Sequence, residues 1–317
     1  MGCYYLYDDW GSSNYDDACQ GPYYLYRAEH ALLRDNAPGL VKAMGGAHHW
    51  VDLGCGTGNK IVDVLNAASN HGTAMNYYPV DISTKFLSIV QQNLKLKSPD
   101  INVVPIAQSY NEQGMITTLE SHLDGDERPK IFSIFGGELM CMDHDRLETL
   151  LARLRDAMKP TDRLFVGYDP QKTETQRHVD SYDSEESHVW FKNIVLGLGQ
   201  FLGTELNPDD FDYVPMFVPS SKFLKPYKGG IVHYLRCRKS FDIKTMDGTQ
   251  LYFEEGELMY MLHSAKPTVE DFQELMKSYG FETVENFADE ENLMSLAVLK
   301  VEDVAEEKEH NPVQLFA

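Results

Sequence analysis

Residues 51–58 and 79–81 carry the residue types and spacing best suited to hold a nucleoside. The segment Val51-Asp52-Leu53-Gly54-Cys55-Gly56-Thr57-Gly58 is an apolar run that ends in closely spaced glycines. Glycine lets the backbone approach a ligand, and free N–H groups at the start of a following helix bind carboxylates. The next apolar run ends in Pro79-Val80-Asp81. A carboxylate at such a strand end can bind both hydroxyls of a ribose.

The glycine loop and Asp81 together predict a ligand site more specifically than either feature does alone. A lone glycine cluster marks a structural turn, and a lone acid marks a helix cap. At the ends of two successive strands, the glycine loop and Asp81 together predict a site for a nucleoside cofactor. The spacing Gly-x-Gly-x-Gly of residues 54–58, followed by Asp81, favours S-adenosyl-L-methionine over a nicotinamide dinucleotide.

Strands and helices alternate along much of the chain, which predicts a mainly parallel sheet with helices on both faces. The expected strands are His49–Leu53, Asn76–Val80, Ile101–Ile106, Ile131–Phe135, Arg163–Gly167, Phe281–Phe287 and Met294–Val301. The expected helices are Glu29–Met44, Lys60–Ala68, Thr84–Leu96, Met115–Leu123, Arg146–Met158 (capped near Asp143 or Asp145) and Thr268–Tyr279.

The alternation of strands and helices does not extend to residues 1–29 or to residues 173–266. Residues 1–29 are crowded with tyrosines, which predicts an arm that packs on something or lines a pocket. The insert 173–266 is expected to hold a helix at Val189–Leu202, a turn-rich stretch at Asn207–Asp212, and strand-like segments around Gly230–Arg236 and Gln250–Phe253. We therefore expect a Rossmann-like cofactor domain at 30–172 and 267–301, a smaller α+β substrate-binding domain at 1–29 and 173–266, and a charged tail at 302–317.

Composition argues against several classes of partner. A net charge of −21 without a basic run argues against a nucleic-acid partner. The longest apolar stretches, such as 194–202, are too short to span a membrane. The N-terminus lacks the pattern of a secretory signal, and the five cysteines are odd in number and never spaced as CxxC. We expect a cytoplasmic protein with reduced thiols, no membrane partner and no metal site.

Longer strings make the chain resemble the histidine-specific N-methyltransferase family, which includes the ergothioneine-pathway histidine methyltransferase and has fungal dimethylallyltryptophan N-methyltransferases as relatives. Tyr7-Asp8-Asp9-Trp10-Gly11-Ser12 is similar to the family's YDxxGS. Residues 23–29 resemble YYxxRxE, and Tyr78-Pro79-Val80-Asp81-Ile82-Ser83 resembles YxPVDIS. The resemblance covers most of the chain. It implies a Rossmann-like class I methyltransferase core with a smaller α+β substrate domain formed by the N-terminal arm and the insert.

The resemblance also implies site residues. The cofactor is expected to contact the glycine loop, including Gly54 and Gly56, and also Tyr7, Lys60, Asp81, Ser109 and Tyr110. The family usually has Asp-Phe where Ser109-Tyr110 stands, so adenine recognition is expected to be adjusted here. The implied substrate pocket contains Tyr15, Tyr23, Gly137, Met142, Tyr182, His233, Leu262 and Ser264.

Two positions depart from the family's histidine enzymes. Met142 replaces an asparagine that holds the amino acid head of the substrate, and Leu262 replaces a glutamate that grips the imidazole. Neither side chain can form the lost hydrogen bonds, and an unpaired polar group costs ~1–3 kcal/mol. Histidine is therefore not the expected substrate. Leu262 suggests an aromatic or apolar group, and Glu138 can pair with an amine.

The expected reaction is methyl transfer to a small-molecule amine of specialised metabolism, which the chain can carry out as a monomer. Tyrosine faces, including those of Tyr15 and Tyr23, can stabilise a methylated cation. His233 is either a base in the pocket wall or a satisfied core residue. Two other functions remain open: transfer to oxygen or carbon, and a binding protein that keeps the fold without catalysis.

Overall fold

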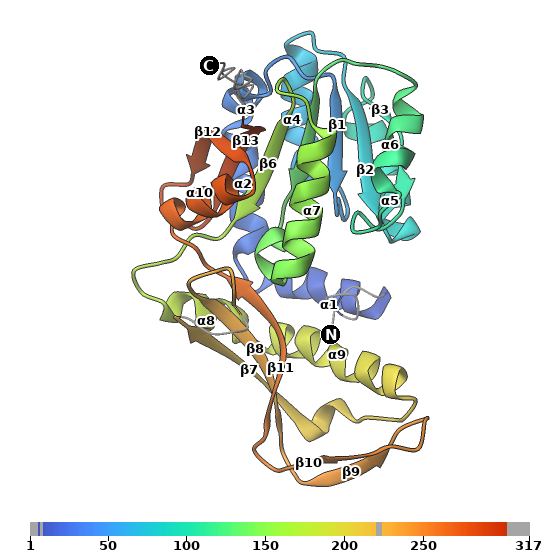
Figure 1. Cartoon of the computed structure of the whole chain (residues 1–317), viewed down its shortest axis with the longest axis vertical. Helices are drawn as coiled ribbons and strands as arrows, with labels where there is room; N and C mark the ends of the chain where they lie inside the picture. Colours follow the sequence, from blue (N-terminus) through green and yellow to red (C-terminus); the bar gives the residue numbers. More distant parts are fainter. Residues whose placement is uncertain (1–5, 7–8, 220–223, 303–317) are drawn as a thin grey trace, which may run out of the picture.

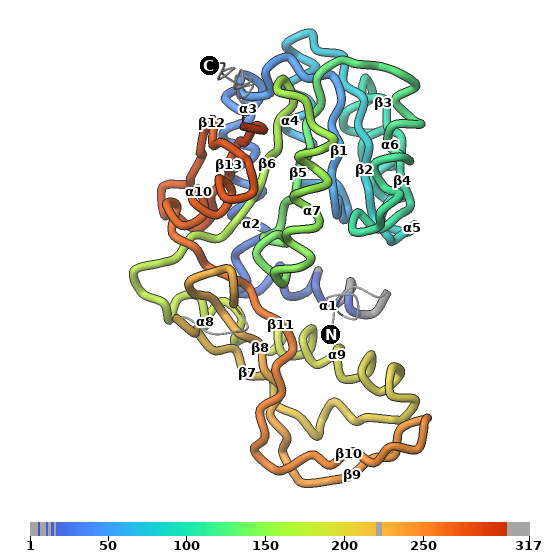
Figure 2. The backbone as a smooth tube through the Cα atoms, in the orientation of Figure 1, coloured from blue at the N-terminus to red at the C-terminus, as the bar shows by residue number. Residues whose placement is uncertain are grey.

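The computed structural model describes residues 6, 9–219 and 224–302 of the 317-residue chain. A larger part contains a mixed sheet, and a smaller part contains a separate antiparallel sheet (Figure 1). Figure 2 shows the chain leaving the larger part after β6 and returning to it through β11 into α10.

The elements follow the chain in this order. The α-helices are α1 (Asp9–Gln20), α2 (Leu25–Asp35), α3 (Ala37–Ala43), α4 (Val62–Asn70), α5 (Thr84–Lys97), α6 (Met115–Leu123), α7 (His144–Ala157), α8 (Gln176–Tyr182), α9 (Glu185–Leu202) and α10 (Val269–Ser278). The strands are β1 (His49–Leu53), β2 (Asn76–Asp81), β3 (Asn102–Val103), β4 (Ile106–Ala107), β5 (Lys130–Ile134), β6 (Arg163–Tyr168), β7 (Phe211–Val218), β8 (Gly230–Cys237), β9 (Phe241–Lys244), β10 (Gln250–Phe253), β11 (Leu258–Ala265), β12 (Phe281–Ala288) and β13 (Ser295–Val301). Short 3₁₀ helices are η2 (Asn59–Ile61), η3 (Glu138–Cys141) and η4 (Pro208–Asp210).

The larger sheet has the strand order β12-β13-β6-β5-β1-β2-β3, and β4 also pairs with β2. Strands β6, β5, β1 and β2 are parallel to their neighbours in this group, whereas β13 is antiparallel to both β6 and β12. Parallel neighbours need crossover connections, and the intervening helices provide them. The mainly parallel α/β sheet predicted from the sequence is confirmed.

Helices cover both faces of this sheet because its central strands are apolar on both sides. Trp50 of β1 belongs to one hydrophobic cluster, with residues of α2, α4 and α5. Val51 and Leu53 belong to a second cluster, with residues of α6, α7 and α10. Successive strand side chains point to opposite faces, so the two clusters lie on either side of the sheet.

The smaller part is built around α9. The three-stranded sheet β11-β8-β7 and the two-stranded sheet β10-β9 are both antiparallel. Helix α1 packs against α9, and the indole of Trp190 donates to the backbone oxygen of Leu6 at 3.2 Å. The N-terminal segment and the insert therefore contact each other although they are far apart in sequence.

Two predicted elements were wrong because of prolines. The single helix expected over Glu29–Met44 is two helices, α2 and α3, separated at Asn36, and Pro38 lies in the first turn of α3. The single strand expected over Ile101–Ile106 is two short strands, β3 and β4, on either side of Val104-Pro105. Proline lacks the N–H that would continue either element.

Several elements of the insert were not predicted: α8, β7, β9 and β11. The stretch expected to be turn-rich, Asn207–Asp212, contains η4 and the first residues of β7. Strand β7 carries Pro215 and lies at the edge of its sheet, which is where a strand tolerates proline.

The structure selects Asp143 as the cap of α7, which the sequence left open between Asp143 and Asp145. The Asp143 side chain accepts a hydrogen bond from the backbone N–H of Arg146 at 3.0 Å, whereas Asp145 lies in the first turn. We expect Asp143→Ala to lower the free energy of unfolding by ~1 kcal/mol, because that N–H loses its acceptor. Asp145→Ala is the matched control and should cost less. Urea denaturation measures both, and a larger loss in Asp145→Ala would contradict this capping assignment.

Candidate functional site

A cavity of about 510 Å³ lies where β1, β2, β4 and β5 end. It is lined by Tyr15, Tyr26, residues 54–60, Asp81, Ile82, Phe86, residues 109–112, Phe135, Gly136, Glu138 and Arg146. The carboxyl ends of parallel strands are the usual place for ligands in such sheets. The cavity brings together Gly54, Gly56, Lys60, Asp81, Ser109, Tyr110, Glu138 and Tyr15, all of which the sequence had singled out.

The glycine loop leaves room for a ligand at its backbone. Gly56 has a φ of 53°, and a Cβ added there would meet no atom within 4 Å, so this residue borders open space. Gly58 has a φ of 66°, and a Cβ there would lie 3.0 Å from Val90. Glycine at position 58 therefore suits both the positive φ and the close packing on Val90. Glycine at position 56 keeps the backbone accessible to a ligand.

Asp81 lies beside this loop because β1 and β2 are adjacent and parallel, with Leu53 opposite Val80. One carboxylate oxygen of Asp81 accepts from the N–H of Gly56 at 3.0 Å, and the other accepts from Ser83 at 2.8 Å. Burial raises the pKa of Asp81 above its usual value, although both hydrogen bonds lower it. The carboxylate is thus fixed at the cavity wall with lone pairs remaining for hydroxyl donors.

Lys60 forms an ion pair with a carboxylate that the sequence had not identified as part of the site. Its ammonium contacts Glu29 of α2, which is fully buried. Both oxygens of Glu29 also accept from the N–H of Gly136, at 2.8 and 2.9 Å. Burial alone would lower the pKa of Lys60, but Glu29 raises it, so the ammonium stays charged. Glu29 is the acid of the YYxxRxE string, which was the only sequence signal for it.

Tyr110 connects the loop after β4 to η3. Its hydroxyl donates to Glu138 at 2.7 Å, and its ring lies 3.4 Å from the position a Cβ on Gly54 would take. Ser109 lines the same wall. The carboxylate of Glu138 is therefore held in the cavity that also contains the glycine loop.

Four predicted substrate-pocket residues form a continuous aromatic path. Ring centroids are 6.1 Å apart for Tyr15 and Tyr23, 5.3 Å for Tyr23 and Tyr182, and 4.9 Å for Tyr182 and His233. Tyr15 lines the cavity, and the other three are buried. The path thus runs from the cavity into the smaller part of the structure.

His233 is enclosed at the far end of this path. Its Nδ1 lies 2.6 Å from the hydroxyl of Tyr213, and its ring stacks on Phe191 at 4.5 Å. Burial lowers the pKa of His233 well below its usual value, and Lys266 and His263 lower it further. The imidazole is neutral near pH 7, a state that suits either of the roles left open by the sequence.

The remaining predicted pocket residues do not line the cavity. Gly137 adjoins it through Gly136, whereas Met142, Leu262 and Ser264 are buried. Ser264 accepts from Lys266 at 3.0 Å and from Tyr182 at 3.3 Å. Tyr7 lies outside the described residues. The roles assigned to all of these residues stay predictions.

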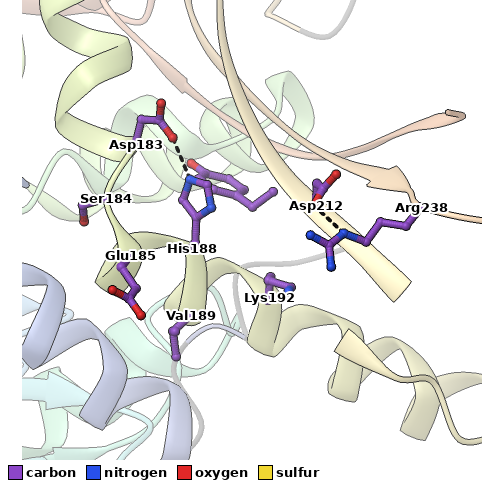
Figure 3. A pocket seen from close by; sticks show the side chains of 9 residues that line it. Asp183, Ser184, Glu185, His188, Val189, Lys192, Asp212 and Arg238 are labelled. Carbon is purple, nitrogen blue, oxygen red and sulfur yellow. Dashed lines mark hydrogen bonds and ion pairs between the residues drawn. The ribbon is translucent and has the colours of Figure 1, made fainter. Parts of the chain in front are cut away.

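A second cavity, of about 440 Å³, lies in the insert between α9 and β7 (Figure 3). Four of its side chains are paired: His188 lies 2.7 Å from Asp183, and Arg238 lies 2.7 Å from Asp212. No residue of the glycine loop lines it. Among the described residues, none of the helices has the length and apolar character of a membrane span, and no group of His, Cys, Asp or Glu side chains is arranged to hold a metal.

Comparison with known proteins places these features in a family. The family described as "Histidine-specific methyltransferase, SAM-dependent" matches residues 1–301. Over 215 residues, 66% of this chain, the sequence is 24% identical to histidine N-alpha-methyltransferase of Mycobacterium tuberculosis (strain CDC 1551 / Oshkosh), and the match spans 64% of that relative's length. N-methyltransferase dtpB of Aspergillus flavus is 30% identical over 79 residues, which are 25% of this chain and 22% of that protein. A solved S-adenosylmethionine-dependent methyltransferase from Clostridium acetobutylicum ATCC 824 is similar with a TM-score of 0.46 and 13% identity, over 91% of this chain and 99% of that one.

The Glu29–Lys60 pair can be tested by removing its charges one at a time. Glu29→Gln leaves the Lys60 ammonium, which is 17% exposed, without a counter-charge, and we expect a loss of ~2–3 kcal/mol in the free energy of unfolding. Adding Lys60→Met should recover part of this loss, because no buried charge then remains. Urea denaturation of the single and double variants checks this. A Glu29→Gln variant as stable as the unaltered chain would show that the pair does not stabilise the fold.

Proposed function

The chain belongs to the histidine-specific, S-adenosylmethionine-dependent methyltransferase family, and we propose that it transfers a methyl group to the amine of a small molecule. It has the mixed α/β fold of class I methyltransferases, with a mostly parallel central sheet and a separate small antiparallel sheet. The observation that carries the proposal is that one cavity is lined by the glycine loop and Asp81 and also by Glu138 and Tyr15.

The residues present fit the cofactor. Open space above Gly56 admits a ligand to the backbone, and η2 and α4 begin directly after the loop, where free N–H groups suit a carboxylate. Asp81 has the remaining lone pairs that ribose hydroxyls need. Ser109 and Tyr110 would contact adenine, and Lys60 and Tyr7 would complete the site. When bound, S-adenosylmethionine supplies an electrophilic methyl group on a sulfonium.

Glu138 is the residue proposed to receive the acceptor amine. An amine must lose its proton to expose the lone pair that forms the new carbon–nitrogen bond, and a carboxylate can first hold the ammonium and then take that proton. The hydroxyl of Tyr110 fixes one Glu138 oxygen, leaving the other available. Tyr15 lines the same cavity, and its ring can stabilise the methylated cation.

We further propose that the acceptor is derived from an amino acid with an aromatic or apolar group, and that it is not histidine. Met142 and Leu262 replace the two polar residues that the family's histidine enzymes use, and both are buried. The aromatic path from Tyr15 to Tyr182 supports an aromatic acceptor. In this proposal residues 1–29 and 173–266 bind the substrate, and residues 30–172 and 267–301 bind the cofactor.

The cofactor site can be tested with Asp81→Asn. We expect the affinity for S-adenosylhomocysteine to fall at least about tenfold, because the ribose hydroxyls lose a charged acceptor. Asp100→Asn, at an exposed position, is the matched control and should bind normally. Calorimetric titration measures both. Unchanged affinity in Asp81→Asn would mean that the nucleoside does not bind at the end of β2.

The acceptor class can be tested by methyl-transfer assays over tryptophan derivatives, other amines and phenols. We expect amines to be methylated, and Glu138→Gln to lower kcat/KM about 10- to 100-fold with little effect on S-adenosylhomocysteine binding. Glu120→Gln, on α6 and exposed, should behave like the unaltered chain. Turnover of phenols alone would reject the amine assignment. If the chain did not bind S-adenosylhomocysteine at all, the alternative of a binding protein that keeps the fold without catalysis would be favoured.

A further inference from the structure

Arg146 places a guanidinium on the cavity wall, where no group of the described residues binds it. The residue lies in the first turn of α7, and its side chain lines the cavity. Within residues 6, 9–219 and 224–302, its backbone N–H bonds to Asp143 but its guanidinium forms no hydrogen bond or ion pair. A partly buried guanidinium with several donors and no acceptor is suited to bind an anion in a bidentate manner.

Among the described residues that line this cavity, Arg146 is the cation without a counter-charge. The other cation lining the cavity is Lys60, whose charge is matched by the buried Glu29. The acids of the wall are Asp81, Glu112 and Glu138. Asp81 binds backbone N–H groups, and Glu112 accepts from the amide of Gln108 at 3.0 Å.

Arg146 and Glu138 act on the same small region. Both influence Cys141, whose thiol pKa is raised to about 12 by burial and by Glu138, against a lowering effect of Lys266 and Arg146. Glu138 lies in η3, which ends at Cys141, and α7 begins three residues later. One stretch of chain therefore presents a carboxylate and a guanidinium to the same cavity.

We propose that Arg146 binds an anionic group, of the carboxylate class, on the methyl acceptor whose ammonium faces Glu138. This inference rests on the proposed function and narrows it: the acceptor carries both charges. Opposite charges on one wall complement a zwitterion, and reversal of the acceptor would place like charges together. Arg146 is thus a specificity residue that holds the acceptor so that its nitrogen meets Glu138.

The cofactor also carries a carboxylate, so the test must separate the two sources. The free N–H groups after the glycine loop already suit the cofactor carboxylate. Arg146 lies in α7, which follows the η3 helix that carries Glu138, rather than on that loop. Removing Arg146 should therefore change acceptor binding and leave cofactor binding intact.

The experiment compares matched pairs of compounds that differ only in a carboxylate. The whole chain, saturated with S-adenosylhomocysteine, is titrated calorimetrically with L-tryptophan and tryptamine, and with L-phenylalanine and phenethylamine. We expect the amino acids to bind at least about tenfold more tightly than the amines. In Arg146→Met this preference should shrink to about twofold or less, and Arg146→Lys should retain part of it. Arg155→Met removes a guanidinium from the same helix that pairs with Asp156, and should keep the preference.

Three outcomes of the binding experiment overturn the inference. They are equal binding of acids and amines by the unaltered chain, failure of the amino acids to bind, and loss of S-adenosylhomocysteine affinity in Arg146→Met. Failure of the proposed function is a different result: the unaltered chain would transfer methyl groups to none of the amines. Turnover of tryptamine and phenethylamine without preference for the acids would keep the methyltransferase and reject the role of Arg146.

Discussion

The site depends on one buried carboxylate, that of Glu29. It contacts the ammonium of Lys60, next to the glycine loop, and the backbone N–H of Gly136, after β5. Its place against β6 exists only because residue 167 is glycine, since a Cβ there would lie 1.9 Å from a Glu29 oxygen. A buried carboxylate is stable only when its hydrogen bonds and counter-charge are in place. Helix α2, the cofactor loop and the loop after β5 are therefore fixed relative to one another as a unit.

A second buried carboxylate extends this arrangement into the smaller part. Tyr24 is the residue directly before α2, and its hydroxyl donates a hydrogen bond to Asp169 at 2.9 Å. Asp169 also forms ion pairs with Lys172 at 2.7 Å and with Lys266 at 2.8 Å. Burial alone would raise the pKa of Asp169, but Lys266, His178 and Lys172 lower it far below its usual range. Lys266 in turn donates to Ser264 and Tyr182, two predicted pocket residues. Helix α2 and the residue that precedes it thus connect the larger part of the structure with the smaller part through two ion-pair networks.

The sequence predicted what is encoded locally and missed what depends on tertiary contacts. The bounds of β1 and α6, the glycine loop and Asp81 follow from short strings whose meaning survives without neighbours. The Glu29–Lys60 contact joins residues 31 apart, and Lys266 reaches Asp169 across the whole insert. No periodicity signals such pairs. Strand β11 was missed for a related reason: its residues from Met261 to Ala265 are all buried, so the polar–apolar alternation of a half-exposed strand is absent.

Met142 and Leu262 are buried, so in the proposed function the polar contacts to the acceptor come from other residues. Met142 is 0% exposed and packs among apolar residues of α7, and Leu262 is 7% exposed and belongs to the other cluster, with Tyr23 and Trp190. Apolar side chains at these positions add to the core, where an unpaired asparagine or glutamate would be costly. The charges of the cavity wall then lie elsewhere, on Glu138 and Arg146, where η3 and α7 meet. In the proposed function the acceptor is bound by Glu138 and Arg146 on η3 and α7, so these residues can differ without a change in the glycine loop that holds the cofactor.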